Sequence, residues 1–248
     1  MRSSNPALVS NPFSGFSLTR PNEAMTVTGT INKTLILLAL VFIPAAWVWR
    51  NFYLSGMNPA SVQGWMMAGL FGGFILAMVT VFKKEWAPFT APLYAVAEGL
   101  FLGGMSGIFE HSYPGIVLQA VSLSIMTLLV MLVAYQSGWI KASNNFRLGI
   151  VAATGGIALT YLISMVLGFF GIHLSFIYGN GLFSILFSVF VVVIAALNFI
   201  IDFDFIAEGA RNRIPKYMEW YGAFALMVTL IWLYIEILRL LSKISERK

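Results

Sequence analysis

Apolar residues run through most of the chain in seven long, continuous stretches that are separated by short polar connections. The stretches span residues 34–49, 62–82, 89–109, 116–135, 148–170, 182–201 and 220–241. An α-helix rises 1.5 Å per residue, so about 20 residues cross the roughly 30 Å of hydrocarbon in a bilayer. Nearly every stretch reaches this length, and the first, which is the shortest, is expected to include Asn32 and Lys33. The pattern predicts seven transmembrane helices.

Closed β-barrels also satisfy every backbone polar group in lipid, but their strands alternate apolar and polar residues over segments of about ten. The stretches in this chain are continuously apolar, which favours helices. With 59% hydrophobic and 10% charged residues, the chain also carries more apolar surface than a soluble fold of 248 residues hides. We therefore predict an all-α, polytopic membrane protein that is embedded in the lipid bilayer.

The first 31 residues differ from the rest of the chain. They are rich in Asn, Ser, Pro and Thr and lack the apolar core of a secretory signal. We predict that residues 1–31 form a mobile cytoplasmic arm and that residues 32–248 form one transmembrane domain. The absence of cysteine excludes disulfides, thiolate nucleophiles and thiolate metal sites.

Lysine and arginine residues concentrate in alternate connections. Ten precede the first stretch or follow the second, fourth and sixth: Arg2, Arg20, Lys33, Lys83, Lys84, Lys141, Arg147, Arg211, Arg213 and Lys216. The opposite connections hold only Arg50. The positive-inside rule therefore places the N-terminus in the cytoplasm. Because these charges are scattered over membrane connections, they indicate topology rather than a nucleic-acid partner.

The C-terminal tail runs against this rule. Seven full crossings place four basic residues outside: Arg239, Lys243, Arg247 and Lys248. Either the last stretch crosses fully, because earlier spans usually dominate topology, or it enters the membrane and returns. We predict the full crossing.

Small residues recur at a spacing of four in two neighbouring stretches. They are Ala60, Gly64, Ala68 and Gly72 in the second, and Gly99, Gly103 and Gly107 in the third. Small side chains at this spacing let helix backbones approach closely, which replaces the hydrophobic drive that lipid does not supply. We interpret both sets as packing surfaces. Glu98 directly precedes Gly99, so we expect it at the border of one of them.

Three carboxylates, Glu98, Asp202 and Glu236, fall within or against apolar stretches. A charge at a helix centre in the membrane costs at least about 2.5 kcal/mol, so such residues usually face a cavity or a partner. Glu98 and Asp202 reach similar depths, about 15 and 18 Å from the same side, which makes them candidate partners. Glu236 lies about 30 Å beyond Pro215 along an unbroken helix, unless that helix breaks or re-enters.

Other interpretations of these acids remain open. Glu98 and Asp202 also fit buried carboxylic acids that hydrogen-bond to a backbone carbonyl or a hydroxyl. Asp204, Glu208 and Glu219 lie near several basic residues of the sixth connection, and interfacial ion pairs are the simpler interpretation for them.

Three segments carry a resemblance to a known family. They are residues 92–103 (PLYAVAEGLFLG), 201–208 (IDFDFIAE) and 233–241 (LYIEILRLL). In this order they resemble the Glu-Gly-bearing third helix, the end of the sixth span and the final helix of the Bax inhibitor family. The resemblance implies a bundle with the last helix central, wrapped by two groups of three. It also implies that Asp202 and Glu236 form an acid pair that senses protons and governs a calcium leak, although Glu236 stands where the family usually has Asp.

The chemistry of such a pair follows from electrostatics. Two carboxyl groups held close in a low dielectric cannot both ionise cheaply, so they share a proton that can hold two helices together. Losing the proton leaves two negative charges that repel each other or attract a hard cation. We predict a pH-sensitive cation leak, with calcium as the conducted ion. Its proton-sensing residues are Asp202, Glu236, Glu98 and Asp204, and Asp202 and Glu236 are weak calcium ligands.

Two other functions use the same features. The acids can serve as the relay of a proton-coupled solute transporter, or the chain can be a non-conducting scaffold that binds other membrane proteins. We expect no enzymatic activity, because an aspartyl dyad of Asp202 with Glu236 or Asp204 lacks any supporting motif. We also expect no cofactor beyond weakly bound calcium.

Overall fold

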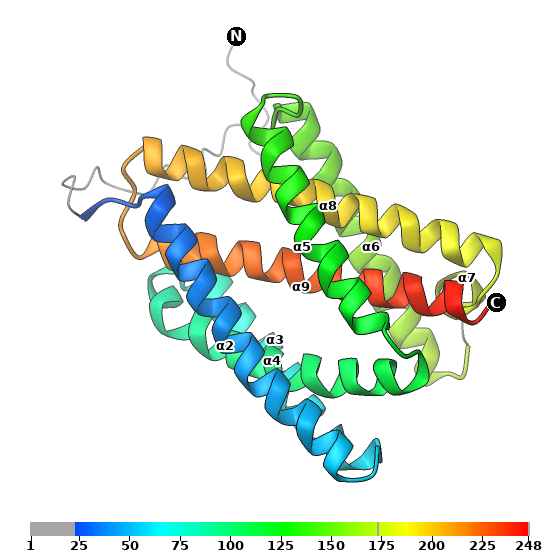
Figure 1. Ribbon diagram of the computed structural model, residues 1–248. Coiled ribbons are helices and arrows are strands. Elements are labelled where there is room, and N and C mark those ends of the chain that lie inside the picture. The colour runs from blue at the N-terminus through cyan, green and yellow to red at the C-terminus, as the bar shows by residue number, and fades with distance from the viewer. Residues whose placement is uncertain (1–22, 173, 248) are drawn as a thin grey trace. The chain divides into compact units, whose positions relative to one another are not determined.

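The computed structural model describes residues 23–172 and 174–247, and these residues are almost entirely helical (Figure 1). Within these described residues, seven helices are long and apolar enough to cross a membrane. They are α2 (Val27–Leu54), α3 (Ala60–Phe82), α4 (Ala87–Ser112), α5 (Ile116–Gln136), α6 (Asn144–Phe169), α8 (Leu182–Arg211) and α9 (Met218–Ser245). A 3₁₀ turn, η2 (Lys84–Trp86), precedes α4, and a short helix, α7 (Ser175–Tyr178), precedes α8. The predicted all-α, polytopic membrane fold is confirmed.

The chain divides into two compact units. The first unit comprises Met1–Ile108 and Asp202–Met227, and the second comprises Phe109–Ile201 and Val228–Lys248. Three helices, α4, α8 and α9, therefore contribute one part to each unit. Half of the most apolar window of α9 is buried, as it is in the helical segment that contains α4, whereas the corresponding share of α2 is 11%. Burial thus does not distinguish α9 from α4, and the central position of the last helix stays a prediction.

The first unit begins before the predicted boundary at residue 32. Helix α2 starts at Val27, and the Thr26 side chain caps it by accepting a hydrogen bond from the Gly29 N–H at 2.9 Å. The preceding residue, Met25, is buried, and its N–H donates to the Ile214 carbonyl at 2.8 Å. Residues 23–31 thus belong to the helical fold, whereas residues 1–22 of the predicted arm lie outside the described residues.

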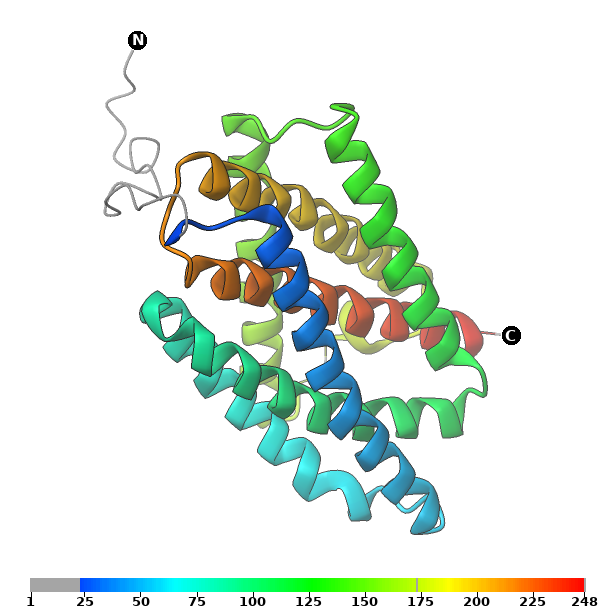
Figure 2. The same cartoon turned by 60° about the vertical axis from the view of Figure 1, so that its left-hand side comes forward.

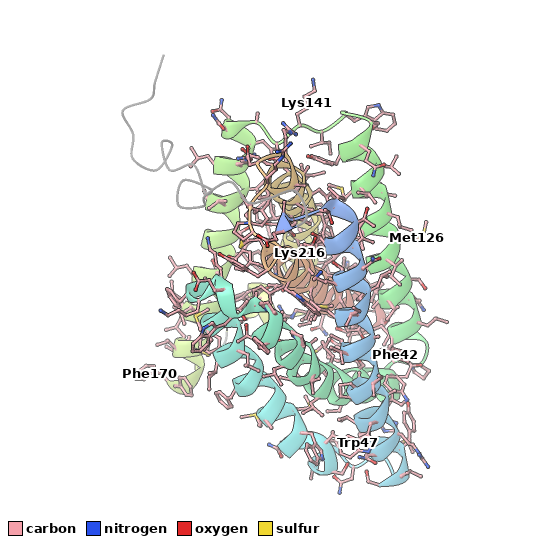
Figure 3. The ribbon with its side chains drawn as sticks, turned by 90° about the vertical axis from the view of Figure 1, so that its left-hand side faces the viewer. Phe42, Trp47, Met126, Lys141, Phe170 and Lys216 are labelled. Atoms are coloured by element: carbon pink, nitrogen blue, oxygen red, sulfur yellow. The ribbon has the colours of Figure 1, made fainter. Side chains whose placement is uncertain are left out.

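The connection between α8 and α9 is tied to this start of the chain. Ala24 forms an antiparallel bridge with Pro215, and the Lys216 N–H donates to the Glu23 carbonyl at 2.9 Å. Figure 3 labels Lys216 beside the start of α2. Pro215, from which the depth of Glu236 was counted in the sequence, therefore lies in the bridge, and α9 begins three residues later at Met218.

The glycines of α4 form a packing surface, as predicted, and the helix that packs on it is α2. A Cβ atom built on Gly99 would lie 2.5 Å from the Pro44 side chain, and one on Gly103 would lie 2.8 Å from Ala45 Cα. Gly107 faces Phe52 in the same way, at 3.1 Å. Real Cβ atoms do not approach other atoms within 3 Å, so α2 and α4 keep this distance only because two of these positions lack a side chain.

The predicted packing surface of α3 is wrong. Gly64 has no atom within 4 Å of a built Cβ, and Gly72 meets only Ala97 at 3.8 Å. The glycines that face α4 are Gly69, whose built Cβ lies 2.5 Å from the Ala97 carbonyl, and Gly73. Figure 2 shows α3 and α4 running side by side. The contact face of α3 is thus rotated from the predicted one by a single residue.

The contrast between these glycines gives a test. Gly99→Ala should destabilise the protein, because its methyl group would overlap α2, and a small-to-large change in a packed interface costs about 1–3 kcal/mol. Gly64→Ala should be neutral or stabilising by up to about 1 kcal/mol, because alanine favours the helix and meets no neighbour there. Thermal unfolding of the purified variants in detergent measures both. Equal effects at the two positions would contradict the packing described.

Helix α9 is continuous from Met218 to Ser245, without the break or re-entrant path considered from the sequence (Figure 1). Within the second unit, two contacts fix its C-terminal end. The Tyr113 hydroxyl donates to the Glu246 carboxylate, and the Lys243 ammonium donates to the Ile177 carbonyl at 2.7 Å. The bond to Glu246 needs the phenol proton and therefore raises the pKa of Tyr113. The end of α9 therefore lies beside the α4–α5 and α6–α8 connections.

This position supports a full crossing of the last helix and yields a prediction. Because an odd number of spans separates the two termini, reporters fused before Met1 and after Lys248 should report opposite sides of the membrane. Two reporters, one active only in the cytoplasm and the other active only outside it, measure the side on which each terminus lies. A reporter inserted in the α5–α6 connection should match the N-terminal one. If the two termini report the same side, α9 does not cross.

Candidate functional site

Glu98 lies near the middle of α4, about 16 Å along the helix from Ala87. Its side chain is half-buried and is hydrogen-bonded to that of Tyr94, one helical turn earlier. Across from it lies Gly73 of α3: a Cβ on this glycine would be 2.9 Å from the Glu98 Oε1 atom. The carboxyl group therefore occupies space that exists because α3 has no side chain there, as expected for an acid at the border of a packing surface.

An aromatic cluster formed by Tyr94, Tyr221 and Phe224 connects Glu98 with Asp202. The rings of Tyr94 and Phe224 are 5.0 Å apart in an edge-to-face arrangement, and those of Phe224 and Tyr221 are 6.2 Å apart. The carboxylate of Asp202, on α8, acts electrostatically on Tyr221. The two acids predicted as partners thus lie in the first unit, where Glu98 is hydrogen-bonded to Tyr94 of this cluster and the charge of Asp202 acts on Tyr221.

Asp204 lies two residues beyond Asp202 on α8 and is half-buried. The next residue, Phe205, packs its ring against Tyr221 with 5.9 Å between the ring centroids. This turn of α8 therefore borders the same aromatic cluster. The proposed proton-sensing role of Asp204 stays a prediction.

Glu219 forms a buried network that the sequence did not reveal. Only 1% of it is exposed, and its carboxylate pairs with Lys33 of α2. The same carboxylate accepts hydrogen bonds from the N–H and the hydroxyl of Thr26, at 3.0 and 2.9 Å. A side chain at Gly29 would overlap it. Glu219 does form an ion pair, as the simpler interpretation held, but with a lysine far away in sequence.

Glu236 is equally buried, with 2% exposed, and belongs to the second unit. Its carboxylate accepts hydrogen bonds from Arg239 at 3.1 and 3.3 Å and from the Tyr161 hydroxyl of α6 at 3.0 Å. The guanidinium group also lies 5.0 Å from the centroid of the Tyr161 ring, a cation–π contact. The carboxylate thus has one charged and one neutral partner.

The predicted pairing of Asp202 with Glu236 joins residues of different units, so it stays a prediction. The partner of Glu236 in the structure is Arg239, one turn further along its own helix. A spacing of three places two side chains on one helix face, which is the signal that identifies this pair from sequence. Among the described residues, no three His, Cys, Asp or Glu side chains are grouped so that they could hold a metal ion.

The Glu236–Arg239 pair is open to a direct test. Arg239→Gln should lower stability more than Glu236→Gln, because it leaves a buried carboxylate without a cation, whereas Arg239 is 32% exposed and can reach water. For a chain of this size, a loss of about 2 kcal/mol lowers Tm by roughly 4–8 °C. Thermal unfolding in detergent measures the loss. The double variant should recover part of it, and additive losses would show that the two residues do not interact.

Comparison with known proteins gives one match. Residues 5–246 match the model of a protein family described as Bax inhibitor 1 like, which covers nearly the whole chain. No curated protein and no solved structure matches the chain. The family is the one suggested by the three segments of sequence.

Proposed function

The chain belongs to the Bax inhibitor 1 like family, and from this membership and the acids inside its spans we propose that it is a pH-sensitive cation leak. Calcium is the ion that we assign to it. The observation that carries the proposal is the arrangement of Glu98 and Asp202 around the aromatic cluster of Tyr94, Tyr221 and Phe224 in the first unit. Glu98 is hydrogen-bonded to Tyr94, and the charge of Asp202 acts on Tyr221.

The gating step in this proposal is a change of protonation at Glu98 and Asp202. When both acids are protonated, they carry no charge, and α4, α8 and α9 pack closely around the aromatic cluster. When the protons leave, two negative charges appear in a region of low dielectric, where they repel each other and attract a hard cation. Because interhelical packing is dense, such a change favours a different packing of these helices over a gradual shift.

Glu236 has a different part in the proposal. A cation already lies within 3.1 Å of its carboxylate, so protonating it would leave the Arg239 guanidinium without its counter-charge. Glu236 therefore stays ionised and holds α9 against α6 through Tyr161. In this proposal the residues that gain and lose protons are the acids of the first unit, Glu98, Asp202 and Asp204, which we call the acid cluster. Asp204, two residues beyond Asp202 on α8 and next to Phe205, is a further proton-sensing carboxylate in this proposal.

Calcium fits the chemistry of these side chains. It prefers six to eight oxygen ligands, and two or three carboxylates with water supply only a weak site. A weak site suits a leak, because conduction requires that an ion leave as readily as it binds. No resident calcium ion is needed for this function.

The test is a flux measurement on protein reconstituted in liposomes loaded with a calcium-sensitive dye. The wild-type rate of calcium entry should change between pH 6 and pH 8. In Asp202→Asn the ratio of the two rates should fall toward one, because the amide does not titrate and Glu98 alone does not create the pair of repelling charges. Glu208→Gln, an equivalent change six residues further along α8, is the matched control and should keep the wild-type ratio.

Three other results of the flux measurement would contradict the proposal. Equal pH responses in Asp202→Asn and the wild type would remove the assignment of the gate. Wild-type liposomes that pass no cation at either pH would reject the leak and favour a non-conducting scaffold. Cation movement that requires an added solute would instead favour proton-coupled transport.

A further inference from the structure

Lys243 is buried in the second unit, with 5% exposed, and lies near the end of α9. Its ammonium donates to three oxygen atoms, one from α7 and two from the beginning of α8. These are the carbonyl of Ile177 at 2.7 Å, the carbonyl of Ser184 at 3.4 Å and the hydroxyl of Ser188 at 2.8 Å. All three oxygens are neutral. The ammonium therefore lies in an oxygen cage built from backbone and hydroxyl groups.

The local backbone explains why these oxygens are available. Helix α7 ends at Tyr178, so the Ile177 carbonyl belongs to the last turn, where carbonyls have no partner within their own helix. The Ser184 hydroxyl donates to this same carbonyl at 3.3 Å, which joins α7 to the first turn of α8. Ser188 follows one turn later on the same face of α8. The cage is thus held by two helices that lie next to each other in sequence.

The charges around the cage lie on one face of α9. Glu236, Arg239, Lys243 and Glu246 are spaced by three, four and three residues, and the other three all act electrostatically on the Lys243 ammonium. Two of the four are acids and two are bases, so the face is neutral as a whole. Removing the ammonium leaves one net negative charge beside the oxygens. A cation that enters the cage restores neutrality.

We propose that Ile177 O, Ser184 O and Ser188 Oγ form a monovalent-cation site that the chain fills with its own Lys243 ammonium. Neutral carbonyl and hydroxyl oxygens replace the hydration shell of potassium or ammonium ions, whereas calcium and magnesium favour carboxylates. Lys243 acts as a tethered cation that keeps free ions out of this end of the second unit. The site is separate from the acid cluster of the first unit and does not depend on the proposed leak.

The test uses Lys243→Ala, which removes the tethered ammonium and leaves space for an ion. The full-length variant is purified in choline chloride, because choline is too large for the cage. Thermal unfolding is then measured as choline is replaced by potassium or ammonium at constant ionic strength. At about ten times Kd, the bound ion should raise Tm by roughly 3–5 °C.

Three control proteins define the result. The wild type should show no such rise, because its cage is filled. Lys243→Met should show none, because an apolar side chain takes the space. Lys141→Ala, which removes an exposed lysine of the same unit, should behave like the wild type. A rise of equal size in all four proteins, or none in Lys243→Ala, would overturn the proposal.

If Lys243→Ala does not fold in choline chloride, the yield of folded protein tests the same site. In that case the yield of monodisperse Lys243→Ala is compared after extraction in choline, potassium and ammonium chloride. Recovery in potassium or ammonium supports the site, and Ser188→Ala in the same background should reduce that recovery by removing one ligand. Equal yields in all three salts would overturn the proposal.

Discussion

An ionised side chain that is cut off from water needs partners close enough to replace its hydration, and this constraint governs α9. Three ionisable residues of this helix are almost fully buried: Glu219, Glu236 and Lys243, with 1%, 2% and 5% exposed. Each has a different kind of partner, namely a lysine of α2, an arginine with a tyrosine, and a set of neutral oxygens. Because such partners must be placed to within a few tenths of an ångström, these contacts set the rotation and depth of α9 within each unit more sharply than apolar packing does.

Glycines in the first unit serve this constraint as well as close packing. Gly29 and Gly73 each face a carboxylate, from Glu219 and Glu98, in the space that a side chain would otherwise fill. In lipid the hydrophobic effect does not bring helices together, so interfaces depend on close backbone approach and on polar contacts. At Gly29 and Gly73 the missing side chain allows close backbone approach and also leaves space for a carboxylate. The glycines of α4 that face α2 provide only the first, because backbone and apolar atoms lie opposite them.

The sequence predicted what depends on local composition, because the length of an apolar stretch in lipid determines a span by itself. It failed where the answer depends on a distant partner. The wrong face of α3 illustrates this: small residues at a spacing of four occur on two adjacent faces, and only the position of α4 selects Gly69 and Gly73. The pair of Lys33 and Glu219 joins residues 186 positions apart, and no pattern in either helix reveals it. Arg239 was within reach of prediction, since it follows Glu236 by three residues, but its charge was interpreted only as a topology signal.

The buried charges of α9 also explain why a basic tail is compatible with a full crossing. The positive-inside rule concerns charges that must be left on one side of the membrane in water or among headgroups. Of the four basic residues at the end of the chain, Arg239 is paired with Glu236, and Lys243 lies within the oxygen cage. A carboxylate balances the charge of Arg239, and neutral oxygens solvate the buried charge of Lys243, so both weigh less against an outside position than exposed, unpaired lysines would. Arg247 is exposed and Lys248 is the last residue, and these two, with Arg50, stand against the ten basic residues counted on the other side. The conflict in the sequence therefore arises from counting charges without asking which of them the folded protein encloses.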